Sequence, residues 1–202
     1  MRTGCYRIAS VVFCGLVSLT SGCAFGTRHA TLGYASTPVV SPSTSTGTPI
    51  SLVRFVDQRG EKRAIGEVRN GYGMRTAEVV PDKDIAAWIT QGVQAELEKA
   101  GYRVSVSETP TTSSPTATLS GDVVTVYCSA MFSYEGEVSF FARLMKDGKE
   151  ILAKRYTGKG SAGLNWAATS TGYADSLSLA LADAIRPLVE DLHAALRSAD
   201  RS

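Results

Sequence analysis

The feature that most constrains the fold is a hairpin pattern in the second half of the chain. Residues 136–145 alternate between apolar and polar side chains, which predicts a strand with one apolar face. That face carries Val138, Phe140, Ala142 and Leu144. Asp147-Gly148 is a dipeptide typical of a tight turn, and residues 150–157 return as the partner strand. A hairpin with one apolar face needs a second layer to cover it.

Two amphipathic helices supply that layer. The first is predicted over residues 84–100, and its apolar stripe is Ile85, Trp88, Ile89, Val93 and Leu97. The second is predicted over residues 173–197, with the stripe Leu177, Leu181, Ile185, Leu188, Leu192 and Leu196. Pro187 lies inside the second helix, so we expect a kink or break near Ala184.

Further strands are predicted from short apolar runs bounded by turn residues. They cover residues 50–56, 64–68, 76–80, 102–106 and 118–128. Together with the hairpin and the helices, they predict the α+β class. We expect a single two-layer domain, with a mostly antiparallel sheet and two amphipathic helices packed on one face.

The N-terminus has the order of a secretory signal. Arg2 and Arg7 precede the uncharged apolar run of residues 8–19, and small residues follow. A helix of that run rises about 18 Å, which is too short for a hydrocarbon core of about 30 Å. We therefore predict a signal peptide over residues 1–22 rather than a membrane-spanning helix.

Cys23 directly follows that signal. Ser21, Gly22 and Cys23 fit the pattern of the bacterial lipobox, whose cysteine becomes the lipidated N-terminus, while Thr20 departs from it. We predict lipid attachment at Cys23; the alternative is plain secretion with an incidental thiol. Residues 23–49 would then be the lipidated cysteine and a disordered Ser/Thr/Pro tether, and residues 50–202 the periplasmic domain.

Charge and cysteine content exclude several classes. Removing Arg2 and Arg7 with the signal leaves 19 Lys+Arg against 19 Asp+Glu, so a nucleic-acid role is not expected. Lipidation of Cys23 would leave Cys128 as the one thiol of the mature chain and exclude an internal disulfide. Cys128 ends an apolar strand pattern, which predicts a buried structural thiol.

Several features together resemble the YajG-like family of bacterial outer-membrane lipoproteins. They are the signal with Cys23, an Asp-x-Arg turn at Asp57 and Arg59, the segment LEKAGYRV at residues 97–104, the hairpin, and the final helix. The resemblance implies no catalytic activity and carries over no site except the anchor. Ala24 is not aspartate, which by similarity to enterobacterial lipoproteins implies delivery to the outer membrane.

Motifs that suggest catalysis or cofactors lack the required context. GKGSAG at residues 158–163 fits a dinucleotide fingerprint, with Asp183 downstream, but no helix follows directly, so we predict a flexible strand-to-helix connection. Ser161 lacks the first glycine of a nucleophile elbow. His29 and His193 do not have zinc-ligand spacing, and His193 is expected at the surface. No cofactor or metal is expected.

Acidic pairs and aromatic residues have structural interpretations. Asp82 and Asp84 are expected at a helix N-terminus, and Glu135 and Glu137 at a solvated strand start. Trp88 is expected in the core. Trp166 lies in a glycine-rich segment and is our candidate for a contact surface.

The predicted function is a non-enzymatic, lipid-anchored interaction or accessory module on the periplasmic face of the outer membrane, with an envelope protein as partner. The first alternative is an auxiliary or carrier lipoprotein that binds an apolar ligand or lipid for a transport system. The second is an enzyme acting on cell-wall glycan, for which no residues pass the geometric requirements.

Overall fold

The computed structural model describes residues 26–34, 49–109, 117–164 and 169–201. In chain order the elements are β1 (Gly26–Ala30), β2 (Pro49–Val53), β3 (Val56–Asp57), β4 (Gly66–Arg69), β5 (Arg75–Pro81), α2 (Ile85–Lys99), β6 (Arg103–Ser107), β7 (Ala117–Ala130), β8 (Ser133–Lys146), β9 (Lys149–Leu164) and α3 (Ser170–Ala199). Both predicted helices and every predicted strand are therefore present, with bounds that shift by a few residues, except that β9 continues beyond its predicted end at residue 157 to Leu164.

The strands form one open, mixed sheet built around the long strand β7. One edge of β7 pairs with β8, and β8 pairs with β9, both antiparallel. The other edge of β7 carries three short parallel strands in succession, which are β2, β3 and β4. β5 pairs with β4, β1 with β5 and β6 with β2. The α+β prediction is confirmed; the long strands are antiparallel, and the short strands add parallel pairs.

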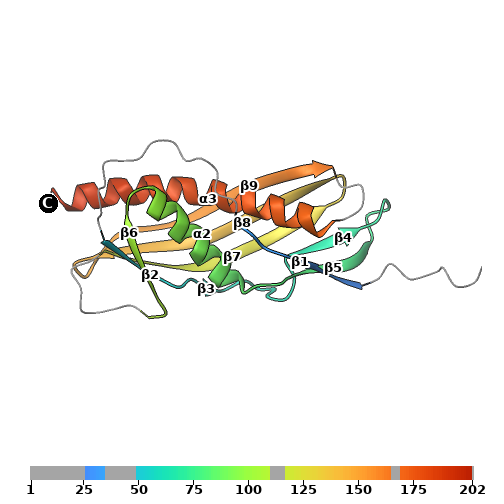
Figure 1. Cartoon of the computed structure of the whole chain (residues 1–202), viewed down its shortest axis with the longest axis horizontal. Helices are drawn as coiled ribbons and strands as arrows, with labels where there is room; N and C mark the ends of the chain where they lie inside the picture. The colour runs from blue at the N-terminus through green and yellow to red at the C-terminus, as the bar shows by residue number, and fades with distance from the viewer. Residues whose placement is uncertain (1–25, 35–48, 110–116, 165–168, 202) are drawn as a thin grey trace, which may run out of the picture.

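Helix α3 runs along β8 and β9, and α2 lies beside it (Figure 1). Of the kink or break expected near Ala184, the break is wrong, because the helix continues from Ser170 to Ala199 with Pro187 inside it. Ala184, Ile185 and Leu188 are fully buried on either side of the proline. Their packing stabilises the helical turns that the proline alone would weaken.

The GKGSAG segment belongs to β9, so the prediction of a flexible connection is wrong. A Cβ at Gly158 would lie 2.2 Å from the carbonyl oxygen of Ala180, and one at Gly160 would lie 2.2 Å from that of Ser176. These glycines are needed because the backbone of α3 lies directly on the strand.

The core fills the space between the sheet and the two helices. Its largest fully buried side chains include Trp88, Tyr156, Tyr173, Phe55 and Phe140. The rings of Phe55 and Phe140 meet edge to face, with centroids 5.5 Å apart. Trp88 is thus confirmed as a core residue.

Residues 26–34 belong to the folded domain. The predicted tether over residues 23–49 is wrong for this part, because β1 pairs with β5, and Ala30 and Leu32 are fully buried. The backbone N–H of Leu32 also donates to Asp82, at 3.0 Å. The domain therefore starts before residue 50, since buried apolar contacts offset the ordering of this segment. Residues 35–48 lie outside the described residues.

Among the described residues, no helix combines the length and the apolar character needed to cross a bilayer.

Candidate functional site

Both residues that the sequence singled out for function lie outside the described residues. Cys23, the predicted lipid attachment site, precedes Gly26, where the description begins. Trp166, the candidate contact residue, falls within 165–168. Both remain predictions.

A pocket of about 430 Å³ lies between the segment that follows β1 and the first turns of α3. Its lining residues are Thr31, Gly33, Tyr34, Ser170, Thr171, Ala174, Asp175 and Ser178. Five of these residues carry a hydroxyl group. Two of the eight, Tyr34 and Asp175, have titratable side chains.

The wall formed by residues 31–34 is held from behind by α2. The indole Nε1 of Trp88 donates to the carbonyl oxygen of Gly33 at 2.9 Å. The hydroxyl of Tyr34 donates to Oε1 of Glu96 at 2.8 Å. Burial of Tyr34, together with the hydrogen bond to Glu96 and the charge of that carboxylate, raises the pKa of the phenol. Tyr34 is therefore a neutral hydrogen-bond donor to Glu96 and not a base.

The opposite wall is the start of α3, which is fixed by Thr169 and Tyr134. The hydroxyl of Thr169 caps the helix by accepting from the backbone N–H of Gly172. The phenol oxygen of Tyr134 accepts from the backbone N–H of Thr169 at 2.7 Å. Because both walls are anchored to the core, the pocket is a fixed hollow whose lining includes hydroxyl groups and the carboxyl group of Asp175.

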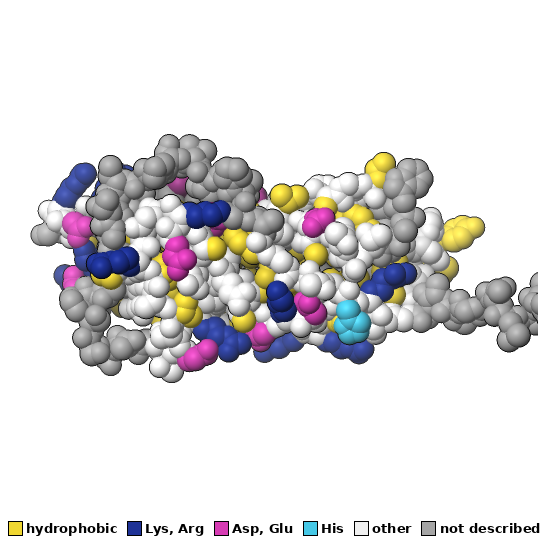
Figure 2. Space-filling model, in the orientation of Figure 1, with side chains coloured by type: hydrophobic (Ala, Val, Ile, Leu, Met, Phe, Trp, Pro, Cys, Tyr) yellow, Lys and Arg dark blue, Asp and Glu magenta, His cyan; other side chains and the backbone are white. Residues whose placement is uncertain are grey.

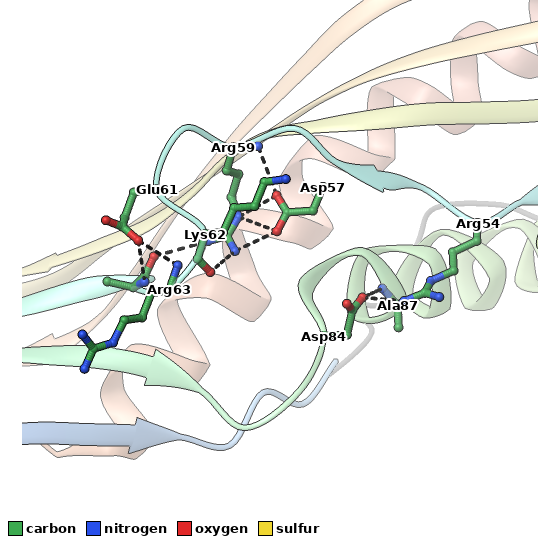
Figure 3. Close-up of polar contacts among 9 residues, drawn as sticks. Arg54, Asp57, Arg59, Glu61, Lys62, Arg63, Asp84 and Ala87 are labelled. Atoms are coloured by element: carbon green, nitrogen blue, oxygen red, sulfur yellow. Dashed lines mark hydrogen bonds and ion pairs between the residues drawn. The ribbon is translucent and has the colours of Figure 1, made fainter.

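The Asp-x-Arg turn forms a second polar cluster, shown in Figure 3. The guanidinium of Arg59 donates to both carboxylate oxygens of Asp57, at 3.0 and 2.9 Å. It also donates to the carbonyl oxygens of Lys62, at 2.8 Å, and Ala64, at 3.3 Å. The side chain of Arg59 is only 4% exposed. This cluster closes the loop between β3 and β4 and leaves the guanidinium no room for a ligand.

The electrostatics of this cluster favour the charged pair. Partial burial would raise the pKa of Asp57, but hydrogen bonds from Arg59 and its positive charge outweigh that effect and hold the pKa below its ordinary value. Asp57 is thus ionised at neutral pH, and its charge is balanced within the loop.

The predicted start of the first helix is confirmed, and Figure 3 shows its cap. Asp84 accepts from the backbone N–H of Ala87 at 2.7 Å and pairs with Arg54 at 2.9 Å. Asp82 instead accepts from Leu32, so it holds the segment after β1 rather than the helix.

The remaining candidate nucleophiles and bases have structural contacts. Cys128 is buried, as predicted, and burial raises the pKa of its thiol to about 11; its Sγ lies 3.1 Å from the hydroxyl of Ser176. Ser161 donates to Glu135 at 2.9 Å. His193 is half-buried, and its Nδ1 lies 3.0 Å from the hydroxyl of Tyr102, whereas we expected it at the surface.

In the described part of the chain, no group of three or more His, Cys, Asp or Glu side chains is placed to hold a metal ion.

Sequence reasoning missed the pocket because it assigned the segment that forms one wall to the tether. A signal was present, since Ala30, Leu32 and Tyr34 recur at the two-residue period of a strand face. This short pattern was outweighed by the Ser/Thr/Pro content of residues 24–49, which is typical of a disordered tether.

One solved structure shows the same fold in another bacterium. Protein XCC0632 from Xanthomonas campestris aligns with a TM-score of 0.60 at 13% identity, over 87% of this chain and 99% of that one. The hypothetical protein CT253 from Chlamydia trachomatis gives a TM-score of 0.49 at 10% identity, over 76% and 99%. Lipoprotein GNA1162 from Neisseria meningitidis gives 0.36 at 15% identity, over 77% and 99%. No curated protein matches the chain.

A family model described as "Uncharacterized lipoprotein" matches residues 36–197. This match supports the resemblance at the level of a bacterial lipoprotein family, while the finer name YajG-like stays a prediction. The matched region includes α2, α3 as far as residue 197, and every strand except β1. The chain therefore belongs to the Lipoprotein_16 family of uncharacterized bacterial lipoproteins.

Proposed function

We propose that the mature protein is a non-enzymatic accessory module of the bacterial cell envelope, anchored by lipid on Cys23 to the periplasmic face of the outer membrane. The observation that carries this proposal is the agreement between two independent features. One is the signal that ends in Ser21, Gly22 and Cys23, and the other is the match to a lipoprotein family over residues 36–197. Two or more acyl chains would hold the protein durably at a bilayer.

The start of the fold gives this anchor a short reach. Cys23 lies three residues before Gly26, the first residue of β1. An extended segment of three residues spans at most about 11 Å. The domain would therefore be held close to the membrane, where its surface meets envelope partners at high effective concentration.

The proposal of a non-enzymatic role rests on how the polar groups are used. The side chains of Asp57, Arg59 and Asp84 are engaged in loop closure and helix capping. Cys128 is buried with a raised pKa, which opposes a role as nucleophile. In the pocket, the hydroxyl of Tyr34 is engaged as a hydrogen-bond donor to Glu96.

The carrier alternative receives less support. A lipid chain needs a deep apolar cavity, whereas four of the eight residues that line the pocket beside α3 are Thr or Ser, and Asp175 is among the others. We expect the native mass of the mature protein to equal that of the lipidated chain or a multiple of it. Extra mass released on denaturation would favour the carrier.

The anchor is tested by expressing the full chain in a Gram-negative host with labelled palmitate and fractionating the envelope. We expect the wild-type protein to be labelled and membrane-bound. Cys23→Ala should lose the label and leave the membrane pellet. Cys14→Ala is the matched control, because that cysteine would be removed with the signal, and it should behave as wild type. A Cys23→Ala protein that keeps the label would contradict the proposal.

The choice of membrane is tested separately. Density-gradient separation should place the wild-type protein in the outer-membrane fractions, and Ala24→Asp should shift it to the inner membrane. Recovery of the wild-type protein in inner-membrane fractions would overturn the proposed outer-membrane location but not the proposed lipid attachment at Cys23.

A further inference from the structure

Exposed hydrophobic side chains gather at one end of the sheet. Tyr72 and Met74 lie in the β4–β5 turn, Met131 and Phe132 in the β7–β8 turn, and Leu164 at the end of β9. Tyr72 is 91% exposed and Phe132 is 73% exposed. These five residues, here called the apolar tip, are more than half of the nine large exposed hydrophobics of the described chain. They form a cluster rather than the scattered single residues that any surface carries.

The strand register places these turns side by side. One row of paired residues crosses the sheet directly behind them, and it runs through Gly26, Ala77, Val68, Ala130, Tyr134 and Ala162. Because each strand ends or turns just beyond this row, all three parts of the apolar tip share one end of the molecule (Figure 1). Figure 2 shows hydrophobic side chains projecting at that end.

The predicted anchor belongs to the same end. Gly26, the first residue of β1, lies in that row, and β1 runs parallel to β5. The N-terminal end of β1 therefore points to the β4–β5 turn. Cys23 is three residues away, so its attachment point is within about 11 Å of the row.

The turns themselves carry no charged residue. Residues 70–74, 131–133 and 162–164 contain no Lys, Arg, Asp or Glu. Glu135, the next carboxylate along β8, accepts hydrogen bonds from Ser133 and Ser161 at 2.6 and 2.9 Å. Arg69 and Arg75 flank the β4–β5 turn, where they pair with Glu67 and Glu78. The opposite end differs, because the β8–β9 turn itself contains Asp147 and lies between Lys146 and Lys149. Charged groups resist transfer into lipid, whereas Tyr, Phe and Met side chains favour the boundary between lipid and water.

We propose that the apolar tip inserts into the interfacial region of the phospholipid bilayer to which Cys23 is anchored. The sheet and α3 then extend away from the membrane, and the charged β8–β9 turn faces the periplasm. This inference rests on the proposed anchor, and it adds a second contact that fixes the orientation of the domain. The lipid surface is favoured over a second copy or a protein because the chain is tethered to lipid at this same end.

A depth probe tests the proposal with the mature lipoprotein purified from membranes. Phe132→Cys and the control Lys149→Cys, at the opposite end, are each labelled with a polarity-sensitive fluorophore. Cys128 is buried, so it will not compete for the label. The proteins are placed in vesicles of phosphatidylethanolamine and phosphatidylglycerol, with and without a doxyl-labelled lipid quencher. We expect the lipid quencher to reduce fluorescence at position 132 by about twofold and to leave position 149 almost unchanged.

Each other outcome has a defined meaning. Attached protein with equal quenching at both positions, or with none at position 132, would overturn the inference and leave the anchor intact. A blue shift at position 132 without quenching by the doxyl lipid would overturn it in favour of a protein contact or a second copy. Protein that fails to stay on vesicles, and whose Cys23 takes the fluorophore before any cysteine is added, would overturn the anchor and the inference together.

Discussion

The guanidinium of Arg59 is almost fully buried, and all its hydrogen-bond partners come from the loop that it closes. They are the carboxylate of Asp57 and the carbonyl oxygens of Lys62 and Ala64. A buried ion pair of this kind adds little beyond a well-packed apolar replacement, but removing one partner leaves an uncompensated charge. The Asp-x-Arg motif therefore specifies the path of the loop between β3 and β4.

Arg59→Met should show this dependence directly. The substitution keeps the aliphatic volume but leaves Asp57 and two carbonyl oxygens without their donor, so we expect a loss of about 3 kcal/mol in the free energy of unfolding. Arg63→Met is the matched control, because the side chain of Arg63 is exposed and pairs with Glu78 across 3.5 Å. It should change stability by less than about 0.5 kcal/mol. Chemical denaturation of the mature proteins measures both, and equal values would refute the structural role of Arg59.

The same pair predicts a dependence of stability on pH. Hydrogen bonds and charge from Arg59 outweigh partial burial and hold the pKa of Asp57 below its ordinary value of 3.8. A lowered folded-state pKa means that the stabilisation is present above pH 3.8 and is lost as pH falls through the folded-state pKa. Asp57→Asn should therefore be less stable than wild type at pH 7, and the difference should shrink below pH 4. A difference that stays constant from pH 7 to pH 3 would contradict this assignment.

At the scale of elements, the segment around β1 is the largest departure from the sequence-based prediction. Its composition predicted a tether, yet Ala30 and Leu32 are fully buried, and Trp88 holds Gly33. The parallel pairing of β1 with β5 joins residues about fifty positions apart. No local pattern specifies such a pairing, because it depends on where the rest of the sheet places an open edge.

Leu32→Ala tests whether this segment belongs to the fold. Removing a fully buried leucine side chain should cost about 3 kcal/mol of unfolding free energy, whereas the same change in a tether would cost nothing. Thr27→Ala, at an exposed position of the same strand, serves as control and should cost less than about 1 kcal/mol. If thermal or urea unfolding gave the same loss of stability for both variants, the segment would be a tether and not part of the fold.

The glycines of β9 show how a motif can arise from packing. The sequence GKGSAG matched a nucleotide fingerprint, but Gly158 and Gly160 are required because α3 lies directly on them. The sequence predicted the helix and the first half of β9, but not the distance between the two elements. Their close approach is a property of the assembled layers.

Gly160→Ala should force α3 away from the sheet. The added Cβ would lie 2.2 Å from the carbonyl oxygen of Ser176, so we expect a loss of about 1–3 kcal/mol. At Gly60 an added Cβ meets nothing within 4 Å, so Gly60→Ala should leave stability within about 0.5 kcal/mol of wild type. Denaturant unfolding measures both effects as shifts of the midpoint at an unchanged m-value. If Gly160→Ala left the stability unchanged, the helix would be free to move on the strand.

At the scale of the whole molecule, the sequence predicted the α+β class, both helices and the hairpin of long strands. These elements carry strong periodic patterns, such as the leucine stripe of α3 and the alternation along β8. The pocket beside Tyr34 and the apolar tip could not be predicted. Each brings together residues from distant segments, such as Tyr34 with Asp175, and Tyr72 with Phe132.

The molecule has two ends of different character, and the predicted anchor lies at the apolar one. The segments that carry Tyr72, Phe132 and Leu164 are uncharged, while the β8–β9 turn at the other end contains Asp147. A lipid group on Cys23 would hold the apolar end of the molecule at the bilayer. The account therefore depends most on the chemistry of that cysteine.

The measurement that tests this claim most directly is the intact mass of the protein extracted from membranes, followed by fragmentation of its N-terminus. The account predicts a chain that begins at Cys23 and carries a diacylglyceryl group on the sulfur, with a further acyl chain on the amino group. An unmodified N-terminus, at Cys23 or at any other residue, would contradict it and would leave the protein an ordinary secreted domain.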